Sequence, residues 1–346
     1  MTGVNFPIQG RTGNAVLAWT RGLLEPALRA SVAQLAEPTR TVCRYHFGWC
    51  EADGRPADKA PGKAFRAALT LACARAVGAP PQTAVTAAAS VELVHNFTLL
   101  HDDIMDGDDT RRHRPAAWSV FGIPAAILAG DALLALAIRD LAAHPSPGAS
   151  AMAAVLGITL VDLANGQSAD IAFESRDLVS LEECLAMASG KTASLLGSAC
   201  LLGAMVGGAS ARRAEHLRSF GHHLGLAFQL VDDLLGLQDD PAVLGKPVRA
   251  DLRSGKKSLP VAAALTSGTD AARRLAALYR SGHRPSEAQM VAAANLIDEA
   301  EGTRWAWDET ERQVRAALAC LRAADPEPHA ADQLTALVTL VTGRHH

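Results

Sequence analysis

Two pairs of neighbouring aspartates stand at widely separated places in the sequence, each directly after an apolar run. The first pair, Asp102 and Asp103, is followed by Asp106, and the second pair is Asp232 and Asp233. On a helix, Asp102 and Asp106 are four residues apart, so their carboxylates project from one face. Mg²⁺ prefers oxygen ligands and commonly combines one or two carboxylates with waters and phosphate oxygens. The spacing therefore suits a diphosphate that is bridged to the protein through metal ions.

The sequence around these aspartates favours a cavity over the alternative, a solvated acidic helix end. Asp102 comes directly after VELVHNFTLL, and Asp232 comes directly after LGLAFQLV. Two such helices, packed antiparallel or nearly so, would place two acidic walls across one mouth. Two unrelated acidic helix ends remain the other interpretation.

Basic residues follow each acidic cluster. Arg111 and Arg112 come after the first cluster, and Lys246, Lys256 and Lys257 come after the second. Guanidinium groups bind phosphate oxygens in a bidentate way, whereas a lysine acts as a point charge. These residues complete a predicted site for diphosphate substrates. The alternative is surface salt bridging, which is a sufficient explanation for Lys257.

The elements that must position these residues are predicted to be helices. Hydrophobic residues make up 49% of the 346-residue chain and aromatic residues only 4%, with Ala and Leu dominant. Such stretches lose little side-chain entropy in a helix, so we expect an all-α protein. Long helices are expected over residues 15–36, 63–77, 83–105, 125–143, 151–168, 181–206 and 211–237, with shorter helices after residue 261. No strand-like alternation competes with them.

Composition also bounds the organisation and the partners of the chain. No shift in composition marks a linker, so we expect a flexible N-terminal arm over residues 1–14 and one helical domain over residues 15–346. The net charge of −3 makes nucleic acid an unfavourable partner. Six scattered cysteines without CxxC spacing argue against zinc and disulfides and fit the cytoplasm. The uncharged run 192–211 is rich in small residues, which favours packing against a helix over a transmembrane segment.

The motifs resemble those of the polyprenyl diphosphate synthase family, the trans-type enzymes that make farnesyl, geranylgeranyl and longer prenyl diphosphates. The resemblance covers residues 62–260. The family's DDxxD motif and double arginine correspond here to 102–106 and 111–112, its GKT element to 190–192, and its FQxxDD element to 228–233. Its GKxxRP element appears as GKAFRA, with Ala67 in place of proline. The histidine of its ExxH pattern is His95, two helical turns before Asp102.

This resemblance implies the isoprenoid synthase fold, a single-domain antiparallel helical bundle with a central active-site cavity, in a protein that forms homodimers. It implies catalytic roles for Asp102, Asp103, Asp106, Lys191 and Asp232, and three Mg²⁺ ions held by Asp102, Asp106 and Asp232. Isopentenyl diphosphate would be bound by Lys63, Arg66, His95 and Arg112. The allylic diphosphate would be bound by Arg111, Lys191, Thr192, Gln229, Lys246 and Lys256.

The implied reaction is ionisation of the allylic diphosphate, condensation with isopentenyl diphosphate, and elimination of a proton. Product length in this family is limited by bulk upstream of the first motif. Phe97 lies about 7.5 Å deeper along the helix than Asp102, and Thr98 is small. This combination resembles enzymes that stop at geranylgeranyl diphosphate, which is therefore the expected product.

Some features depart from the family pattern and leave alternatives open. Gly236 stands where a third aspartate is usual in the second motif. This departure, with Ala67, supports the alternative of a non-catalytic regulatory subunit, and a class I terpene cyclase is a further alternative that the isopentenyl diphosphate site argues against. The YHFGWC segment at 45–50 resembles actinobacterial members, some of which are carried inside protein shells. An encapsulating shell is thus a candidate partner.

Overall fold

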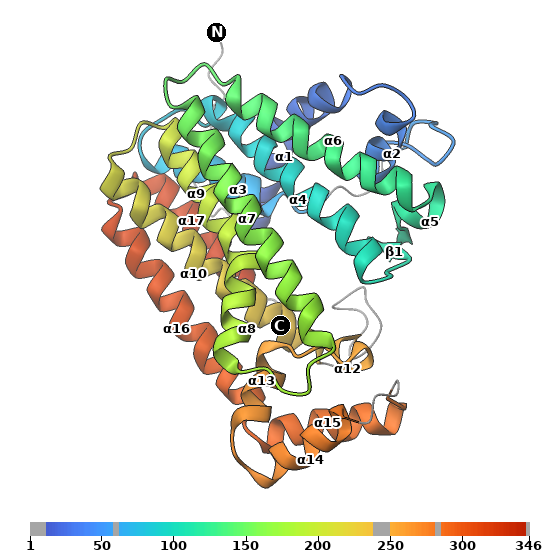
Figure 1. Cartoon of the computed structure of the whole chain (residues 1–346). Helices are drawn as coiled ribbons and strands as arrows, with labels where there is room; N and C mark the ends of the chain where they lie inside the picture. Colours follow the sequence, from blue (N-terminus) through green and yellow to red (C-terminus); the bar gives the residue numbers. More distant parts are fainter. Residues whose placement is uncertain (1–11, 58–61, 238–249, 281–284, 344–346) are drawn as a thin grey trace.

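Helices form nearly the whole architecture of the computed structural model, which describes residues 12–57, 62–237, 250–280 and 285–343 (Figure 1). The predicted all-α class is confirmed. The N-terminal elements are α1 (Gly13–Val32), α2 (Thr39–His46), α3 (Phe65–Ala76), the 3₁₀ turn η1 (Pro81–Ala84), α4 (Val85–Met105), β1 (Thr110–Arg111), β2 (Arg114–Pro115), α5 (Ala117–Phe121) and α6 (Ile123–Ala142). The elements that follow are α7 (Ala149–Glu174), α8 (Leu181–Ala188), the π-helix η2 (Ser189–Ala193), α9 (Ser194–Val206), α10 (Ala211–Gly236), α12 (Ala250–Ser254), α13 (Leu259–Thr266), α14 (Asp270–Tyr279), α15 (Glu287–Glu299), α16 (Gly302–Ala323) and α17 (Pro328–Thr342).

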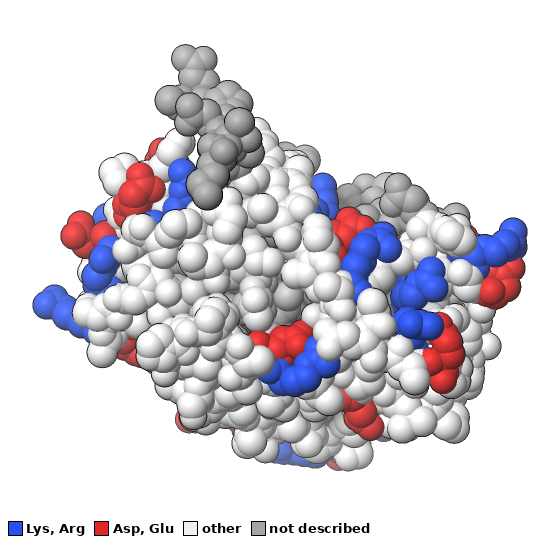
Figure 2. Space-filling model, turned by 90° about the horizontal axis from the view of Figure 1, so that it is seen from above, with Lys and Arg blue, Asp and Glu red and all other residues white. Residues whose placement is uncertain are grey.

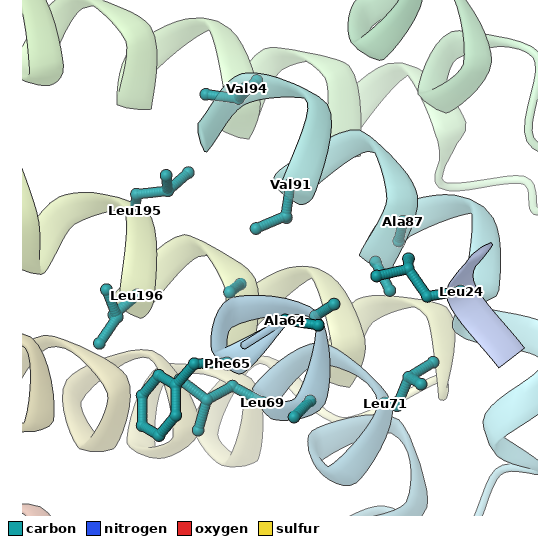
Figure 3. Close-up of a cluster of buried hydrophobic side chains, with 14 of the residues drawn as sticks. Leu24, Ala64, Phe65, Leu69, Leu71, Ala87, Val91, Val94, Leu195 and Leu196 are labelled. Atoms are coloured by element: carbon teal, nitrogen blue, oxygen red, sulfur yellow. The ribbon is translucent and has the colours of Figure 1, made fainter. Parts of the chain in front are cut away.

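The centre of the bundle is α3, in which every residue except Arg66 and Arg75 is buried. Its many alanines let other backbones approach closely, so that a Cβ added at Gly203 of α9 would lie 2.1 Å from the Thr70 carbonyl oxygen. Figure 3 shows α3 between α4 and α9, with apolar side chains of all three helices filling the space between them. Each fully buried leucine in this cluster contributes about 1.5–3 kcal/mol relative to an exposed one. The core therefore fixes the direction of α4, whose end carries the first aspartate pair.

The predicted helix over residues 181–206 is interrupted by the π-helix η2, which contains Gly190 and Lys191. A Cβ at Gly166 of α7 would lie 2.3 Å from the Lys191 backbone nitrogen, so the two backbones are in direct contact there. Ser194 donates a hydrogen bond of 2.6 Å from its hydroxyl to the Gly190 carbonyl oxygen and so satisfies a group beside the irregular turn. π-helical turns are often found at functional sites.

A small hairpin departs from the prediction that no strands would form. Among the described residues, β1 and β2 form one two-stranded antiparallel ladder in which Arg111 is paired with Arg114. The two residues between them, Arg112 and His113, have φ values of 52° and 60°. Positive φ at both central positions is the signature of the tight turns that connect hairpins. A ladder this short has too few residues to show alternation in the sequence.

Two stretches of the described chain are long and apolar enough to cross a membrane by length and composition alone. They are 149–174, whose apolar window is 28% buried, and 181–206, whose window is 56% buried. The second includes most of the uncharged run, and the expected packing is confirmed because α9 contacts both α3 and α10. Figure 2 shows charged side chains gathered mainly towards the two sides of the face seen from above, with one mixed acidic and basic group near its lower middle and uncharged side chains over much of the rest.

Candidate active site

The first acidic wall is the C-terminal end of α4, where Asp102 and Asp106 lie one turn apart. Asp102 is partly buried, and its burial raises the pKa of the carboxyl to about 6, with Lys191 lowering it and Asp106 raising it further. A buried carboxylate next to a like charge is costly until a cation neutralises it. This end of α4 is therefore suited to bind positive charge.

Asp103 faces the protein interior, in contrast to its neighbours. Its side chain is only 1% exposed and forms an ion pair with Arg111, whose Nε donates to Oδ1 at 2.7 Å. Burial raises the pKa of Asp103, and the guanidinium of Arg111 opposes that rise. Asp103 thus anchors the hairpin to α4, and this role explains its position without any metal contact.

The first acidic wall is in contact with the segment just before α13. Lys256, which follows the second aspartate pair, places its Nζ 3.3 Å from Oδ2 of Asp106, at a separation of 150 residues. Both aspartate pairs lie at the C-terminal ends of their helices, and in Figure 1 α4 and α10 run in the same general direction. The antiparallel arrangement expected for these two helices is therefore wrong, and the expected meeting of their acidic ends stays a prediction.

In the second acidic wall, as in the first, the second aspartate of the pair is buried and the first is more exposed. Asp233 is 7% exposed, accepts a 2.6 Å hydrogen bond from Nε2 of Gln229, and accepts a 2.8 Å hydrogen bond from the backbone N–H of Leu259. It thereby holds the start of α13 against α10. Asp232 is only partly buried. Gly236, where the third aspartate was missing, is buried at the end of α10.

Thr192 and Gln229 form a chain of hydrogen bonds beside this wall. The hydroxyl of Thr192 donates to Oε1 of Gln229 at 2.6 Å, and Gln229 in turn donates to Asp233. Because Thr192 is only 7% exposed, its hydroxyl is committed to fixing the amide of Gln229. The predicted pair is thus brought together, with Gln229 as the more exposed member.

Lys191 points from the π-helix towards α7. Its Nζ donates a 2.5 Å hydrogen bond to Oδ2 of Asp170, and it is close enough to Asp102 to lower the pKa of that carboxyl. The sequence analysis did not identify Asp170. Asp170 lies between Asp162 and Glu174 in α7, and nothing in this spacing indicates a partner 21 residues later.

A separate basic cluster lies around the start of α3. Arg66 donates from Nη1 to Nε2 of His95 at 3.2 Å, which requires an unprotonated Nε2 because a guanidinium only donates. Burial and the nearby Arg66 and Arg112 lower the pKa of His95 well below its ordinary value. Lys63 is exposed at the edge of this cluster. Four residues were predicted to bind isopentenyl diphosphate. Three of them, Arg66, His95 and Arg112, lie close enough for the charges of the two arginines to lower the pKa of the histidine.

Two predicted residues have contacts that bear on the proposed chain-length limit. Phe97 is partly buried and packs edge-on against His101, with ring centroids 4.8 Å apart. Thr98 donates from its hydroxyl to the His95 carbonyl oxygen at 2.8 Å. The Phe97 ring therefore has a partner that restricts its rotation.

Two of the predicted lysines, Lys257 and Lys246, stand apart from the rest. Lys257 is buried and donates to the Phe173 carbonyl oxygen at 2.8 Å, so the interpretation of it as a surface salt bridge was wrong. Lys246 lies outside the described residues.

The residues present fit magnesium ions that share their ligands with a substrate. Within residues 12–57, 62–237, 250–280 and 285–343, no three His, Cys, Asp or Glu side chains cluster as a ready-made metal site. Mg²⁺ does not require such a cluster, because it usually keeps several waters and takes one or two carboxylates together with phosphate oxygens. The partly buried Asp102 and Asp232, with Asp106 one turn from Asp102, supply oxygen donors of the required kind.

Comparison with known proteins agrees with this geometry. A family model described as Polyprenyl synthetase matches residues 53–297. The (2E,6E)-farnesyl diphosphate synthase of Mycobacterium tuberculosis (strain ATCC 25618 / H37Rv) is 46% identical over 302 residues, which cover 86% of this chain and 84% of that protein. The geranylgeranyl diphosphate synthase of the same strain is 43% identical over 333 residues, which cover 96% of this chain and 94% of that protein.

A solved structure extends the likeness to the fold. The polyprenyl synthetase from Streptomyces coelicolor A3(2) superposes with a TM-score of 0.90 at 47% identity, over 94% of this chain and 98% of that one. These relatives are also consistent with the expected likeness to actinobacterial proteins. The aspartate motifs, the helical fold and the family match lead to one conclusion: the chain belongs to the polyprenyl synthetase family.

Proposed function

We propose that this protein is a trans-prenyltransferase that joins isopentenyl diphosphate to an allylic prenyl diphosphate. The observation that carries the proposal is the ion pair between Lys256, which follows the second aspartate pair, and Asp106 of the first acidic wall, together with a separate basic cluster at Arg66, His95 and Arg112. One group of charges suits a metal-bridged diphosphate, and the other suits a diphosphate bound by cations directly. The names of the mycobacterial synthases support the same activity.

The residues of the acidic walls would bind the allylic substrate and promote loss of its diphosphate. Magnesium ions, when held by Asp102, Asp106 and Asp232, supply positive charge that offsets the negative charge developing on the departing diphosphate. Lys191 and Lys256 already lie against carboxylates at this mouth, and they would exchange those partners for phosphate oxygens. Arg111 and, in the predicted set, Lys246 would add to this binding. Breaking the carbon–oxygen bond leaves an allylic cation.

The basic cluster would hold the second substrate against that cation. Lys63, Arg66, His95 and Arg112 would fix the diphosphate of isopentenyl diphosphate so that its double bond attacks at close range and forms the new carbon–carbon bond. Loss of a proton from the condensed product restores a double bond, and the released diphosphate is the base that accepts it. The oxygens of Thr192 and Gln229 would face the cation with their dipoles.

Product length would be limited by Phe97, with geranylgeranyl diphosphate as the expected product. The support is the packing of Phe97 against His101, which holds a bulky ring on the same helix as the first motif. The relatives include both a farnesyl and a geranylgeranyl diphosphate synthase, so the identity of the product is decided only by experiment.

We also propose a homodimer formed through the outer faces of α6 and α7. These neighbouring helices expose large apolar side chains: Ile123, Ile127, Leu128, Ile138, Ile158, Val161 and Ile171. Monomers rarely expose so many together, and a symmetric interface between copies would cover them. Analytical ultracentrifugation should give a dimer mass, and the double substitution Leu128→Glu and Ile158→Glu should give a monomer. A wild-type monomer would contradict the proposal.

The expected boundary of an arm over residues 1–14 and one helical domain over residues 15–346 is shifted, because α1 begins at the buried Gly13, and residues 1–11 lie outside the described residues. We propose a cytoplasmic location and a role for the arm in loading a protein shell. If deletion of residues 1–13 leaves a co-expressed shell fully loaded, the role in loading is wrong.

The decisive experiment is incubation of the protein with isopentenyl diphosphate, Mg²⁺ and each of dimethylallyl, geranyl and farnesyl diphosphate. Products are sized after phosphatase treatment. We expect a C20 alcohol that disappears with excess EDTA, and longer alcohols from Phe97→Ala. Leu178→Ala, at an exposed loop position, is the control that should leave product length unchanged.

The other outcomes separate the alternatives. No elongation with any allylic substrate would indicate a non-catalytic subunit. A cyclic hydrocarbon formed without isopentenyl diphosphate would indicate a terpene cyclase. Unchanged product length in Phe97→Ala would remove Phe97 as the limit while leaving the reaction in place.

A further inference from the structure

The segment Tyr45–Cys50 packs against the hairpin that carries Arg111 and Arg112. Tyr45 donates from its hydroxyl to the Pro115 carbonyl oxygen at 2.9 Å. Arg114 donates from Nη1 to the carbonyl oxygen of Tyr45 and from Nη2 to that of Cys50, each at 3.2 Å. Arg114 also stacks on the Tyr45 ring, with its guanidinium carbon 4.2 Å from the ring centre. Both ends of the segment are therefore tied to β2.

These contacts support a turn that is unfavourable by itself. Arg112 and His113 both have positive φ, and neither is glycine. Such conformations cost about 1–3 kcal/mol per residue and persist where surrounding contacts fix them. The structure thus maintains a strained turn, and the residue at its first position is one of the arginines proposed to bind isopentenyl diphosphate.

One hydrogen-bond chain runs from the same segment to the Arg112 side chain. His46 is 8% exposed and has its Nε2 3.2 Å from Oδ1 of Asn96, which is 1% exposed. Nη2 of Arg112 lies 3.5 Å from the same oxygen. The amide nitrogen of Asn96 donates to the Glu92 carbonyl oxygen at 2.8 Å, one turn earlier in α4. This last bond fixes the amide so that its oxygen faces both partners.

The protonation of His46 follows from this arrangement. An amide oxygen only accepts, so Nε2 of His46 must carry the proton that it donates to Asn96. Burial and the charges of Arg112 and Arg111 lower the pKa of His46 to about 3, and the ring is therefore neutral near neutral pH. His46 acts here as a fixed donor.

The backbone at Gly62 also lies close against the Arg112 guanidinium. A Cβ added to Gly62 would lie 2.8 Å from Nη2 of Arg112. Gly62, Asn96 and Arg112, together with the 5%-exposed Glu92, also line one small cavity of about 30 Å³. The carboxylate of Glu92 contributes a favourable charge to Arg112. The guanidinium is thus contacted by an amide oxygen and by a backbone position at which only a hydrogen atom fits.

We propose that His46 and Asn96 are positioning residues that hold the Arg112 guanidinium in place for the diphosphate of isopentenyl diphosphate. The inference rests on the proposed function, in which Arg112 contacts that substrate. It gives the YHFGWC segment a role in substrate binding although none of its residues needs to touch the substrate. Asn96 orients Arg112 directly, and His46 acts through Asn96.

The test measures the Kd of isopentenyl diphosphate without an allylic substrate, and the KM of each substrate in steady state. Asn96→Ala and His46→Phe should each raise the Kd and KM of isopentenyl diphosphate about tenfold, because each removes a hydrogen bond in a chain that ends on a charged group. The KM of the allylic substrate and kcat should change less than about threefold. His46→Gln keeps an N–H donor and should recover most of the affinity.

A double-mutant cycle separates positioning from general damage to the fold. In an Arg112→Ala background, His46→Phe and Asn96→Ala should have little further effect on the Kd of isopentenyl diphosphate, because the residue through which they act is gone. Leu217→Ala, at a fully buried site in α10, is the control for lost stability and should lower Tm without changing that Kd. Fully additive effects in the cycle would overturn the proposal.

Gly62→Ala provides an independent variant that changes neither His46 nor Asn96. Because the clashing atom is the end of a flexible side chain, the methyl group should displace the guanidinium at little cost in Tm and raise the Kd of isopentenyl diphosphate. An unchanged Kd in Arg112→Ala itself would refute the assignment of Arg112. An increase for Arg112→Ala but none for Asn96→Ala, His46→Phe or Gly62→Ala would refute only the positioning role.

Discussion

The two aspartate pairs look alike in the sequence and are divided alike in the structure, but they are held by different partners. In each pair the second aspartate, Asp103 or Asp233, is buried. Asp103 is bound to a guanidinium on a hairpin, whereas Asp233 is bound to an amide and to the first backbone N–H of α13. The first aspartates, Asp102 and Asp232, are more exposed than these neighbours.

Identical neighbouring aspartates therefore have two different roles, one in holding the fold together and one in the site. A buried carboxylate that accepts strong hydrogen bonds from the protein, through Oδ1 in Asp103 and through both oxygens in Asp233, contributes to folding and is less available to a metal ion. The more exposed carboxylate is free to change partners when substrate arrives. We therefore expect substitution of the first aspartate in each pair to reduce activity and substitution of the second to reduce stability.

The largest expected effect is loss of activity at the first aspartates. Asp102→Asn and Asp232→Asn should each lower kcat by about 100- to 1,000-fold, because each removes a charge that acts on the developing diphosphate. Steady-state assays at saturating Mg²⁺ measure the loss. Asp162→Asn, at an exposed position of α7, serves as the control. A loss below tenfold at Asp102 would show that the two aspartates of the pair are not divided in this way.

The stability of Asp102→Asn provides a second check with a definite sign. The pKa of Asp102 in the folded protein is about 6, above its ordinary value of 3.8, so ionised Asp102 destabilises the metal-free protein above pH 6. That cost disappears as the pH falls through 6 towards 3.8. Without metal, Asp102→Asn should therefore raise Tm at pH 8 and leave it nearly unchanged at pH 4. A lower Tm at pH 8 would mean that the carboxylate stabilises the fold.

A smaller effect, on stability, is expected at the second aspartates. Asp103→Asn leaves the partly buried Arg111 without its counter-ion and should lower the free energy of unfolding by about 2–3 kcal/mol. Asp233→Asn keeps an oxygen for the Leu259 N–H and should cost only about 1–2 kcal/mol. Urea denaturation measures both. If Asp233→Asn proved the more damaging, the backbone contact would matter more than the ion pair.

Much of this arrangement could be predicted from the sequence, because its signals are local. The spacing of Asp102 and Asp106 and the apolar runs before both pairs indicated helices that end at one mouth. The helix 63–77 was predicted within two residues of the observed α3 at its N-terminal end and one at its C-terminal end. Such features depend on helical periodicity, which a few consecutive residues reveal.

The features that were missed depend on contacts between distant segments. Nothing near Asp170 indicates that it binds Lys191, since the contact arises from the close approach of α7 to η2 at Gly166. The role of His46 likewise depends on a residue 50 positions away. The direction of α4 relative to α10 was predicted wrongly. Periodicity indicates that each segment is a helix, but the direction in which two helices run depends on which of their ends carry the aspartates.

The π-helix has a consequence for the rotational phase of the helix that contains it. A π-helical turn holds about one residue more than an α-helical turn, and each residue rotates an α-helix by about 100°. Bonding Ser189–Ala193 as a uniform α-helix without removing a residue would therefore turn α9 by about that angle relative to α8. Gly203 would no longer face the Thr70 carbonyl oxygen while Lys191 still faced Asp170. The irregular turn thus lets Lys191 face Asp170 on α7 while Gly203 faces α3, which a uniform helix could not do.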